Sequence, residues 1–523
     1  MKRTISLVAC IFCCLILTAG CSSLSSPSSL ARDPNNLVAA MISENLIVKE
    51  GFIANVDIIG LCCDPEKQMP MCYGNNPGAP YIVAYVPEGY GQTTINSPLN
   101  YYSFPPAPSS VGGDNRSRSY RFGPNEVVVI VGKTPPSKST YYSFNTYVGL
   151  RCVTGNCFAG ATPDFRNDYQ RRFASMVDAL NNHTIWTTGT PGGVAGDSFG
   201  KDTMIIITSD RSTDQRIREA ARKATYSEFI INTIILPAEI ARLGLDYGKD
   251  EIAMLFRLAV WDDTYINNPP LRVFRIASTA SVLDPFPTPA LTPRGGKSVS
   301  EKVRFGAAVS ALRSAILQQY CGYTATEYKT DIWVPEGRES LALDTNGVFN
   351  GYDVLGDNHD AFYLRIPDLA GGKPADKGNT FSLDNSQDDF IIVYGVNHTK
   401  AGFTTYSSIS TYRHAMLNGG ESKWIEPDGT SAFFYLKDSP YADQAQYLYV
   451  MRVARSCADT NRNGELCMEL PECVGCPANC KPECKTTGAD DLFLGVRGYL
   501  EPATGVGPSY DEIIWDSAIH FRK

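Results

Sequence analysis

The fold of this chain is decided by Val127-Val128-Val129-Ile130-Val131-Gly132 and the block after it, Thr140-Tyr141-Tyr142-Ser143-Phe144-Asn145-Thr146-Tyr147. A second copy of the pattern is Phe390-Ile391-Ile392-Val393-Tyr394-Gly395, followed by Thr405-Tyr406-Ser407-Ser408-Ile409-Ser410-Thr411-Tyr412. Each begins with β-branched and aromatic residues that predict a buried strand. The eight-residue blocks agree at Thr, Tyr, Ser, Thr and Tyr. Self-similarity over so long a period predicts an internal duplication.

Weaker matches flank these blocks on both sides. Upstream, 81–88 parallels 361–368, and downstream, 251–260 parallels 446–454, in each case as a pattern of apolar residues. We therefore predict an α+β, β-rich fold made of two duplicated β-sandwich-like halves.

The first half is predicted to carry an inserted strand–helix–strand unit. A strand is expected at 204–207, a helix from the capping box Ser212-Thr213-Asp214-Gln215 to Lys223, and a strand at 229–236. Before it, Thr162-Pro163 predicts a helix start. Apolar residues then recur at helical spacing: Phe165, Tyr169, Phe173, Met176, Val177 and Leu180.

The halves are expected to be joined by a linker and a helix. Residues 284–298 are rich in Pro and Gly, which predicts a linker. The capping box at Ser298-Val299-Ser300-Glu301 opens a predicted connecting helix over 299–322, with Val303, Ala307, Leu312, Ile316 and Leu317 on it. The first β-rich domain then spans 37–283 and the second 323–523.

The N-terminus has the features of an export signal. Lys2 and Arg3 precede an apolar run over 5–17, which is shorter than the about 20 residues of a spanning helix. Leu17-Thr18-Ala19-Gly20-Cys21 resembles the lipobox of bacterial lipoproteins. The resemblance implies cleavage after residue 20, lipid on Cys21 and, because Ser22 follows, the outer membrane. The alternative is an ordinary secretory signal with a chance cysteine.

Composition and net charge limit the classes of binding partner that we expect. Residues 21–36 are Ser-rich and predict a flexible tether. The full chain has 523 residues and a net charge of −8; removing residues 1–20 takes away Lys2 and Arg3 and no acid, which gives −10. A nucleic-acid binder would carry a basic face. We expect no nucleic-acid partner, a membrane reached through lipid, and a protein or glycan partner outside it.

Cysteine usage indicates an oxidising compartment. The chain has 16 cysteines, of which three leave with the signal and Cys21 takes the lipid. The remaining even number predicts disulfides. Structural zinc in the Cys-rich segment 457–484, and redox use of its Cys-x-x-Cys pair, are the alternatives. The disulfide candidates are Cys62, Cys63, Cys72, Cys152, Cys157, Cys321, Cys457, Cys467, Cys473, Cys476, Cys480 and Cys484.

One more local resemblance concerns the fold alone. Thr134-Pro135-Pro136 followed by Tyr141-Tyr142-Ser143-Phe144 looks like a strand–loop–strand signature of β-sandwich domains of unknown function in bacteria and large viruses. The second half lacks the Pro-Pro pair. The resemblance implies a sandwich and no activity.

Three groups of residues are candidate sites. Asp459, Asn461, Asn463 and Glu465, with Gly464 at the sixth position, match the first half of a calcium loop, although the twelfth position is Leu470. A polar turn between Cys457 and Cys467 is the plainer reading.

The second group is acidic and could bind a metal or form an acid–base pair, or be a solvated loop. It consists of Asp344, Asp353, Asp357, His359 and Asp360. The third is the tyrosine block, either a ligand-binding face or sheet packing.

The sequence predicts only a broad functional class. There is no His-Glu-x-x-His and no Gly-x-x-x-x-Gly-Lys phosphate loop, so no catalytic residue is assigned. We expect a membrane-anchored envelope lipoprotein with a non-catalytic binding or structural role and no obligatory cofactor, calcium aside. The alternative is a metal-dependent envelope hydrolase that uses the acidic loop near His359.

Overall fold

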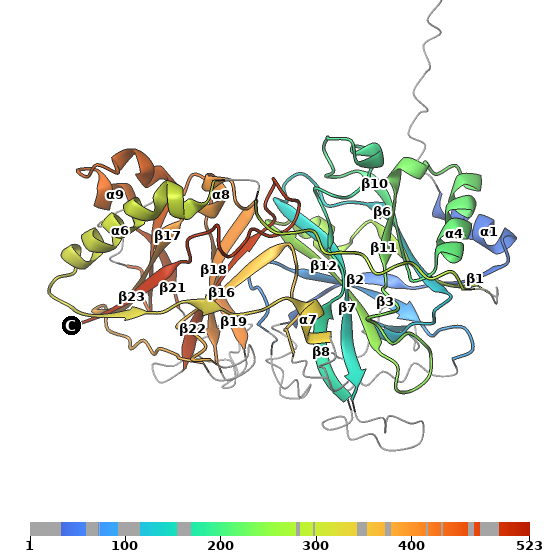
Figure 1. Cartoon of the computed structure of the whole chain (residues 1–523), viewed down its shortest axis with the longest axis horizontal. Helices are drawn as coiled ribbons and strands as arrows, with labels where there is room; N and C mark the ends of the chain where they lie inside the picture. The colour runs from blue at the N-terminus through green and yellow to red at the C-terminus, as the bar shows by residue number, and fades with distance from the viewer. Residues whose placement is uncertain are drawn as a thin grey trace, which may run out of the picture.

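Four β-sheets, two in each half of the chain, make up the part of the fold that the computed structural model describes (Figure 1). The halves lie side by side along the long axis, and we call the sheet of each half that carries helices its outer sheet and the other its inner sheet. The described residues are 33–58, 72, 74–92, 116–153, 169–278, 283–296, 299–341, 353–371, 378–414, 417–429, 432–458, 465–470 and 491–523.

The first half contains two five-strand paths. Its outer sheet has the order β1 (Leu46–Glu50), β13 (Leu271–Ser278), β6 (Glu126–Lys133), β10 (Asp202–Thr208) and β11 (Ile231–Ile235). Its inner sheet has the order β2 (Phe52–Val56), β3 (Tyr81–Pro87), β12 (Glu251–Ala259), β7 (Tyr141–Cys152) and β8 (Tyr169–Ser175). Three short strands pair with it: β4 (Arg116–Ser117), β5 (Ser119–Arg121) and β9 (Leu180–Asn181).

The second half repeats this arrangement. Its outer sheet has the order β14 (Thr324–Tyr328), β23 (Ser517–Arg522), β17 (Asp389–Val396), β20 (Leu448–Ala454) and β21 (Leu466–Glu469). Its inner sheet has the order β15 (Asp331–Ile332), β16 (Ala361–Ile366), β22 (Leu492–Tyr499), β18 (Tyr406–Arg413) and β19 (Asn418–Trp424).

The two halves correspond strand for strand, which confirms the predicted duplication. In both, the first strand pairs with the last, and the last two strands of the outer path are parallel while the other pairs of the two paths are antiparallel. The strands β6 and β17 are apolar at almost every position because both faces of each are covered.

One of the predicted repeat matches is wrong. The counterpart of β12 is β22, and the counterpart of β20 is β10, so 251–260 does not correspond to 446–454. Both segments are strands buried on two sides. Such strands share an apolar pattern whatever their place in a sheet, so the pattern could not separate them.

The predicted strand–helix–strand unit is present as β10, α4 (Arg211–Lys223) and β11. Its strands have counterparts in β20 and β21, so the prediction that the unit is an insertion is wrong for the strands. Among residues 455–458 and 465, described between β20 and β21, no helix occurs. The helix α4 starts earlier than the capping box at Ser212 predicts, because the side chain of Asp210 accepts a hydrogen bond from the Thr213 amide at 2.7 Å.

The helix predicted over 162–180 is wrong for its described part. Residues Tyr169–Ser175 form strand β8, which pairs antiparallel with β7. Pairing with the long β7 satisfies backbone groups that a helix would satisfy locally, and it overrides the helical spacing of apolar residues. The shorter β9 also pairs with β7.

Helices cover the outer sheets (Figure 1). In the first half, α1 (Pro34–Ser43) and α4 pack on one cluster with β6, β10 and β13; α1 begins within the segment predicted as tether. In the second half, α6 (Glu301–Gln319) buries Phe305, Ala308, Leu312 and Ile316, with α9 (Ala432–Leu436) beside it. Val303, one of the apolar residues predicted on this helix, is 77% exposed.

The other helices whose bounds lie within the described residues are short. They are α5 (Asp263–Asn267), α7 (Gly337–Leu341), α8 (His398–Ala401) and the 3-10 turns Pro191–Gly193, Glu228–Ile230 and Ala442–Tyr447. Within the described residues, no helix combines the length and the apolar character that crossing a membrane requires.

Candidate functional site

The duplication places two arginines at equivalent positions on the inner sheets. Arg257 on β12 lies opposite Tyr81 on β3, and Arg497 on β22 lies opposite Tyr363 on β16. All four side chains are buried. The inner sheets therefore present the same Arg–Tyr pair twice, once from each half.

Each arginine reaches a backbone carbonyl of the other half. The guanidinium of Arg257 donates to the carbonyl oxygen of Gly356, and that of Arg497 donates to the carbonyl oxygen of Gly74. The two glycines are themselves equivalent, since each lies seven residues before the tyrosine that faces the arginine of its own half. Both have positive φ, 60° and 73°, a region that favours glycine.

The backbone around these glycines also crosses between the halves. The amide of Gly74 donates to the carbonyl of Leu417 at 2.9 Å, and the amide of Gly356 donates to the carbonyl of Phe173 at 2.8 Å. Leu417 precedes β19 and Phe173 lies in β8, which are equivalent strands. Residues 74–78 of the first half therefore bind to the inner sheet of the second half, and residues 356–360 of the second half bind to the inner sheet of the first. We call these the crossing segments.

The residues after the two glycines, Asn75 and Asp357, bind the other half through their side chains. The amide of Gly419 donates to Oδ1 of Asn75 at 2.9 Å, and the amide of Ser175 donates to Oδ1 of Asp357 at 2.7 Å. The hydroxyl of Ser175 also donates to Asp357, at 2.6 Å. Because the exchange is reciprocal, neither half completes its inner sheet and turns without the other.

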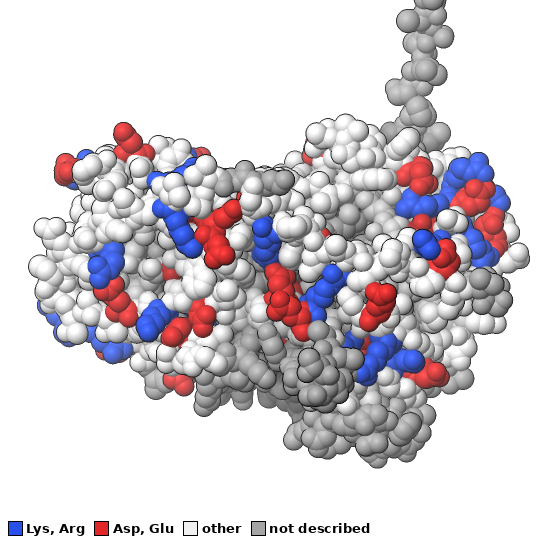
Figure 2. Space-filling model, in the orientation of Figure 1, with Lys and Arg blue, Asp and Glu red and all other residues white. Residues whose placement is uncertain are grey.

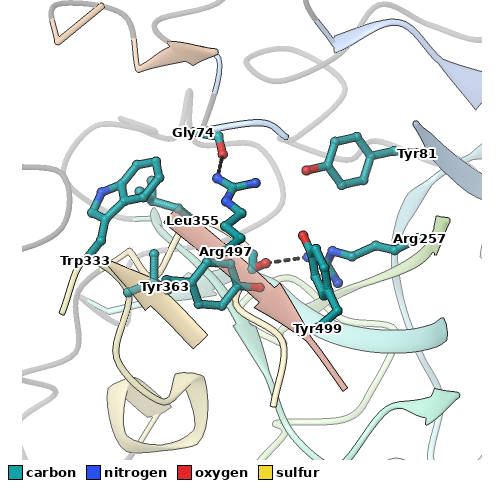
Figure 3. Close-up of a pocket in the computed structure, with 10 residues that line it drawn as sticks. Gly74, Tyr81, Arg257, Trp333, Leu355, Tyr363, Arg497 and Tyr499 are labelled. Carbon is teal, nitrogen blue, oxygen red and sulfur yellow. Dashed lines mark hydrogen bonds between the residues drawn. The ribbon is translucent and has the colours of Figure 1, made fainter. Parts of the chain in front are cut away.

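A small cavity lies between the halves at this contact (Figure 3). Its volume of about 10 Å³ gives room for one molecule the size of water. Arg257 and Arg497 both line it, together with Tyr81, Tyr363 and Tyr499. Figure 3 shows the phenol rings and the two guanidinium groups gathered around the same space.

The two guanidinium groups are cations in a buried setting. Each residue is only 4% exposed, and within the described part of the chain neither forms an ion pair. Aromatic faces surround them: Arg497 lies 5.3 Å from the ring centre of Trp333 and 5.6 Å from that of Tyr412, and Arg257 lies 5.4 Å from that of Tyr147. Burial lowers the pKa of both groups, the nearby phenols raise it, and the net shift is upward.

The predicted acidic loop proves to be one of the crossing segments. Asp357 and Asp360 are buried, so the solvated-loop interpretation is wrong for both. Asp360 accepts from the hydroxyl of Tyr141 at 2.9 Å and from the amide group of Asn181 at 3.0 Å. Burial raises the pKa of Asp357 to about 6 and that of Asp360 to about 7.

The other two acids of this group lie apart from that arrangement. Asp353 forms an ion pair with Arg171, a residue of β8 in the first half. Asp344 is outside the described residues.

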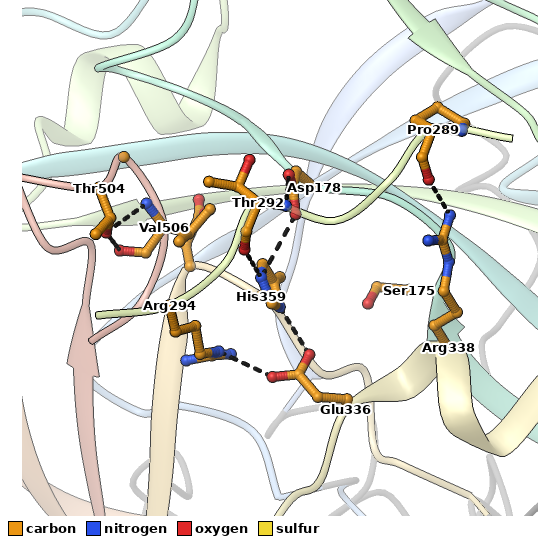
Figure 4. Close-up of polar contacts among 12 residues, drawn as sticks. Ser175, Asp178, Pro289, Thr292, Arg294, Glu336, Arg338, His359, Thr504 and Val506 are labelled. Carbon is orange, nitrogen blue, oxygen red and sulfur yellow. Dashed lines mark hydrogen bonds and ion pairs between the residues drawn. The ribbon is translucent and has the colours of Figure 1, made fainter. Parts of the chain in front are cut away.

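His359 makes a hydrogen bond through both ring nitrogens (Figure 4). Nδ1 lies 2.7 Å from the carboxylate of Glu336, and Nε2 lies 2.9 Å from the carbonyl oxygen of Thr292 in the linker. Arg294 binds the same glutamate at 2.9 Å. Burial lowers the pKa of His359, but the bond to Glu336 helps to raise it, and the net shift is upward. Two acceptors fit an imidazolium that donates twice, which has no lone pair for a metal or a substrate proton.

The linker is bound rather than free. Thr292 donates its amide to Asp178 of the first half at 2.8 Å, and its carbonyl faces His359 of the second. The carbonyl of Pro289 accepts from Arg338 at 2.8 Å (Figure 4). The linker therefore contacts both halves, in addition to the two crossing segments.

Three other histidines are buried in the second half: His398, His414 and His520. His398 lies between Glu301 on α6, at 2.8 Å, and Asp516, at 3.4 Å. His520 contacts Asp389 and the hydroxyl of Tyr328. Among the described residues, no three His, Cys, Asp or Glu side chains are grouped so that they could hold a metal ion.

The predicted calcium loop is described only at its end. Asp459, Asn461 and Asn463 lie outside the described residues. Glu465 is buried, and its carboxylate accepts hydrogen bonds from the hydroxyls of Tyr320, at 2.7 Å, and Tyr435.

The cysteines bear out the disulfide prediction in part. Cys457 and Cys467 form a disulfide, and Cys72 and Cys152 are disulfide-bonded as well. Cys321 is free and exposed, which corrects its place among the disulfide candidates: it follows α6 at the surface, where nothing demands a bridge. Outside the described residues lie Cys21, Cys62, Cys63, Cys157, Cys473, Cys476, Cys480 and Cys484.

The tyrosine blocks are packing residues. Tyr141, Tyr142, Tyr147, Tyr406 and Tyr412 are each at most 1% exposed, which confirms the packing interpretation over an exposed binding face. The sequence reasoning missed the paired arginines, because the erroneous match of β12 with β20 hid the correspondence of their strands.

A serine-hydrolase pattern was also missed. Gly196-Asp197-Ser198-Phe199-Gly200 fits Gly-x-Ser-x-Gly, whose serine in hydrolases sits on a strand-to-helix turn. Here the segment is a loop that leads into β10. The hydroxyl of the buried Ser198 donates to the carbonyl of Asn182 at 2.7 Å, so it is held by the backbone and not by a base.

Comparisons with known proteins leave the class open. No family model matches the chain, and no curated protein matches it. A solved structure of the M60 catalytic domain with two CBM51 domains from Clostridium perfringens ZmpB aligns over 92% of this chain and 43% of that one, with 9% identity and a TM-score of 0.10. The chain thus spans less than half of that structure, and so low a score carries no argument for a shared fold.

Proposed function

We propose that this chain is a lipid-anchored protein of the bacterial cell envelope, in which two joined halves act as one rigid binding or structural module. Two features support the location. The sequence around Cys21 has the order of a lipobox, and the described cysteines include bonded ones, which persist in oxidising compartments. The ligand-binding part would face a protein or glycan outside the membrane.

The observation that carries the non-catalytic role is the use of the acidic loop. Asp357 and Asp360 accept hydrogen bonds from the first half, and both ring nitrogens of His359 face acceptors. A metal-dependent hydrolase would need these groups to be open to a metal or a water. The contacts favour a role in joining the halves.

The anchor is tested by metabolic labelling with radioactive palmitate. The wild-type protein is expected to take up label and to fractionate with membranes, whereas Cys21→Ala is expected to lose the label. Cys321→Ala is the matched control, since that cysteine is free and exposed, and it is expected to be labelled like the wild type. Equal labelling of Cys21→Ala and wild type would contradict the proposal.

The hydrolase alternative and the calcium loop are tested on the same purified protein. Zinc, manganese and calcium are titrated in turn by calorimetry, and the melting temperature is compared with that in a chelator. Heat or a shift with zinc or manganese that disappears in His359→Gln would support the hydrolase. Heat with calcium that disappears in Asp459→Ala would support the calcium loop.

A further inference from the structure

The cavity between the halves is lined by two positively charged side chains, and no described carboxylate neutralises them. Arg257 and Arg497 bring two guanidinium groups to one cavity, and in the part of the chain that the structure describes neither has a carboxylate partner there. Buried charges are normally paired, because taking a charge out of water is costly. By contrast, Arg151 and Arg275, which are equally buried in the first half, pair with Asp250 and Glu126 at 2.6 Å.

Hydrogen-bond donors of both halves line this cavity. The Nε atom of Arg497 is buried and has no hydrogen-bond partner among the described residues. The hydroxyl oxygen of Tyr81 accepts from the amide of Asn76 at 2.8 Å, and that of Tyr499 accepts from its side-chain nitrogen at 3.3 Å. Because each phenol already accepts, its own proton remains available to donate.

The size of the cavity selects among anions. A volume of about 10 Å³ holds one particle the size of water. A halide ion is a single atom and fits this scale, whereas sulfate, phosphate or a carboxylate has several heavy atoms and would force the halves apart.

We propose that the cavity between Arg257 and Arg497 binds one chloride ion, which joins the two halves by compensating their facing arginines. The ligand is a small monovalent anion held by guanidinium and phenol donors, two of them from each half. This site is independent of the envelope location proposed above, because it rests only on contacts between the halves.

The experiment measures the melting temperature of the purified protein in detergent at fixed sodium concentration, while chloride replaces gluconate. A saturable rise is expected with chloride and with bromide, and no such rise with sulfate. In Arg497→Met the dependence on chloride is expected to vanish. Arg452→Met is the matched control: this arginine also stacks on an aromatic ring, that of Phe390, but on the outer sheet, and its variant should keep the dependence.

Two results would overturn the proposal. One is a wild-type melting temperature that is the same in chloride and gluconate, which would assign the cavity to water. The other is a dependence that persists in Arg497→Met. If that variant does not fold, crystals of the wild type grown in bromide decide the question: an anomalous bromine peak between the two arginines supports the site, and its absence rejects it.

Discussion

Arg257 and Arg497 occupy equivalent positions in the two halves, and each donates a hydrogen bond to the backbone of the half to which it does not belong. The relationship follows from the duplication, since one strand pattern used twice gives the contact an approximate two-fold symmetry. The halves are therefore joined by an exchange of segments, as in a swapped dimer, although both belong to one chain.

A substitution at Gly356 tests how much the crossing segment 356–360 contributes to stability. In Gly356→Ala the new Cβ would lie 2.5 Å from the ring of Phe173 at a φ of +73°, so we expect a loss of about 3 kcal/mol in the free energy of unfolding, from backbone strain and overpacking together. Gly200→Ala is the control, because φ there is +65° and nothing lies within 4 Å. It should lose only about 1 kcal/mol. Equal losses in chemical denaturation would contradict the role of Gly356.

Arg151 ties the first half to α7 of the second. It pairs with Asp250 and donates to the carbonyl of Leu341 at 3.0 Å, and it is fully buried. Arg151→Met leaves the Asp250 charge buried, so we expect a loss of about 3–5 kcal/mol in urea titrations. Arg222→Met, at the exposed pair with Glu219, should change stability by less than about 0.5 kcal/mol. A small effect at Arg151 would show that the pair is dispensable.

His398 should make stability depend on pH. Burial lowers its pKa, but Glu301 and Asp516 raise it, and the net value is about 10. The folded-state pKa lies above the unfolded value of about 6.5, so the stabilisation is complete below pH 6.5 and is lost as the pH rises towards 10. We expect the free energy of unfolding to fall by a few kcal/mol between pH 7 and 10 in the wild type. The fall should be absent in His398→Gln; an unchanged slope would refute the assignment.

The disulfide Cys457–Cys467 closes a loop with a sequence separation of 10. Removing it with Cys457→Ala and Cys467→Ala should cost about 3 kcal/mol, because the unfolded chain regains the entropy that the closed loop denied it. Cys321→Ala is the control and should leave the melting temperature unchanged. Equal melting temperatures for all three proteins would show that the bridge does not brace this half.

The local pattern of the sequence was enough to predict the duplication and the strands β6, β7, β17 and β18, since their β-branched runs and tyrosine blocks fall in register. It could not predict the crossing segments. The bond from Arg497 to Gly74 joins residues 423 positions apart, and no local periodicity encodes such a contact. Where two periodicities compete, as in Tyr169–Ser175, pairing with β7 decides the outcome. The residue types of the acidic loop indicate a site, but the burial of the loop depends on contacts with the other half.

The reciprocal contacts make the two halves one cooperative unit, and differential scanning calorimetry of the purified protein tests this cooperativity. The exchanged segments predict a single transition whose calorimetric enthalpy equals its van't Hoff enthalpy. Two separate transitions, or a calorimetric enthalpy about twice the van't Hoff value, would show that the halves unfold independently and would contradict the account.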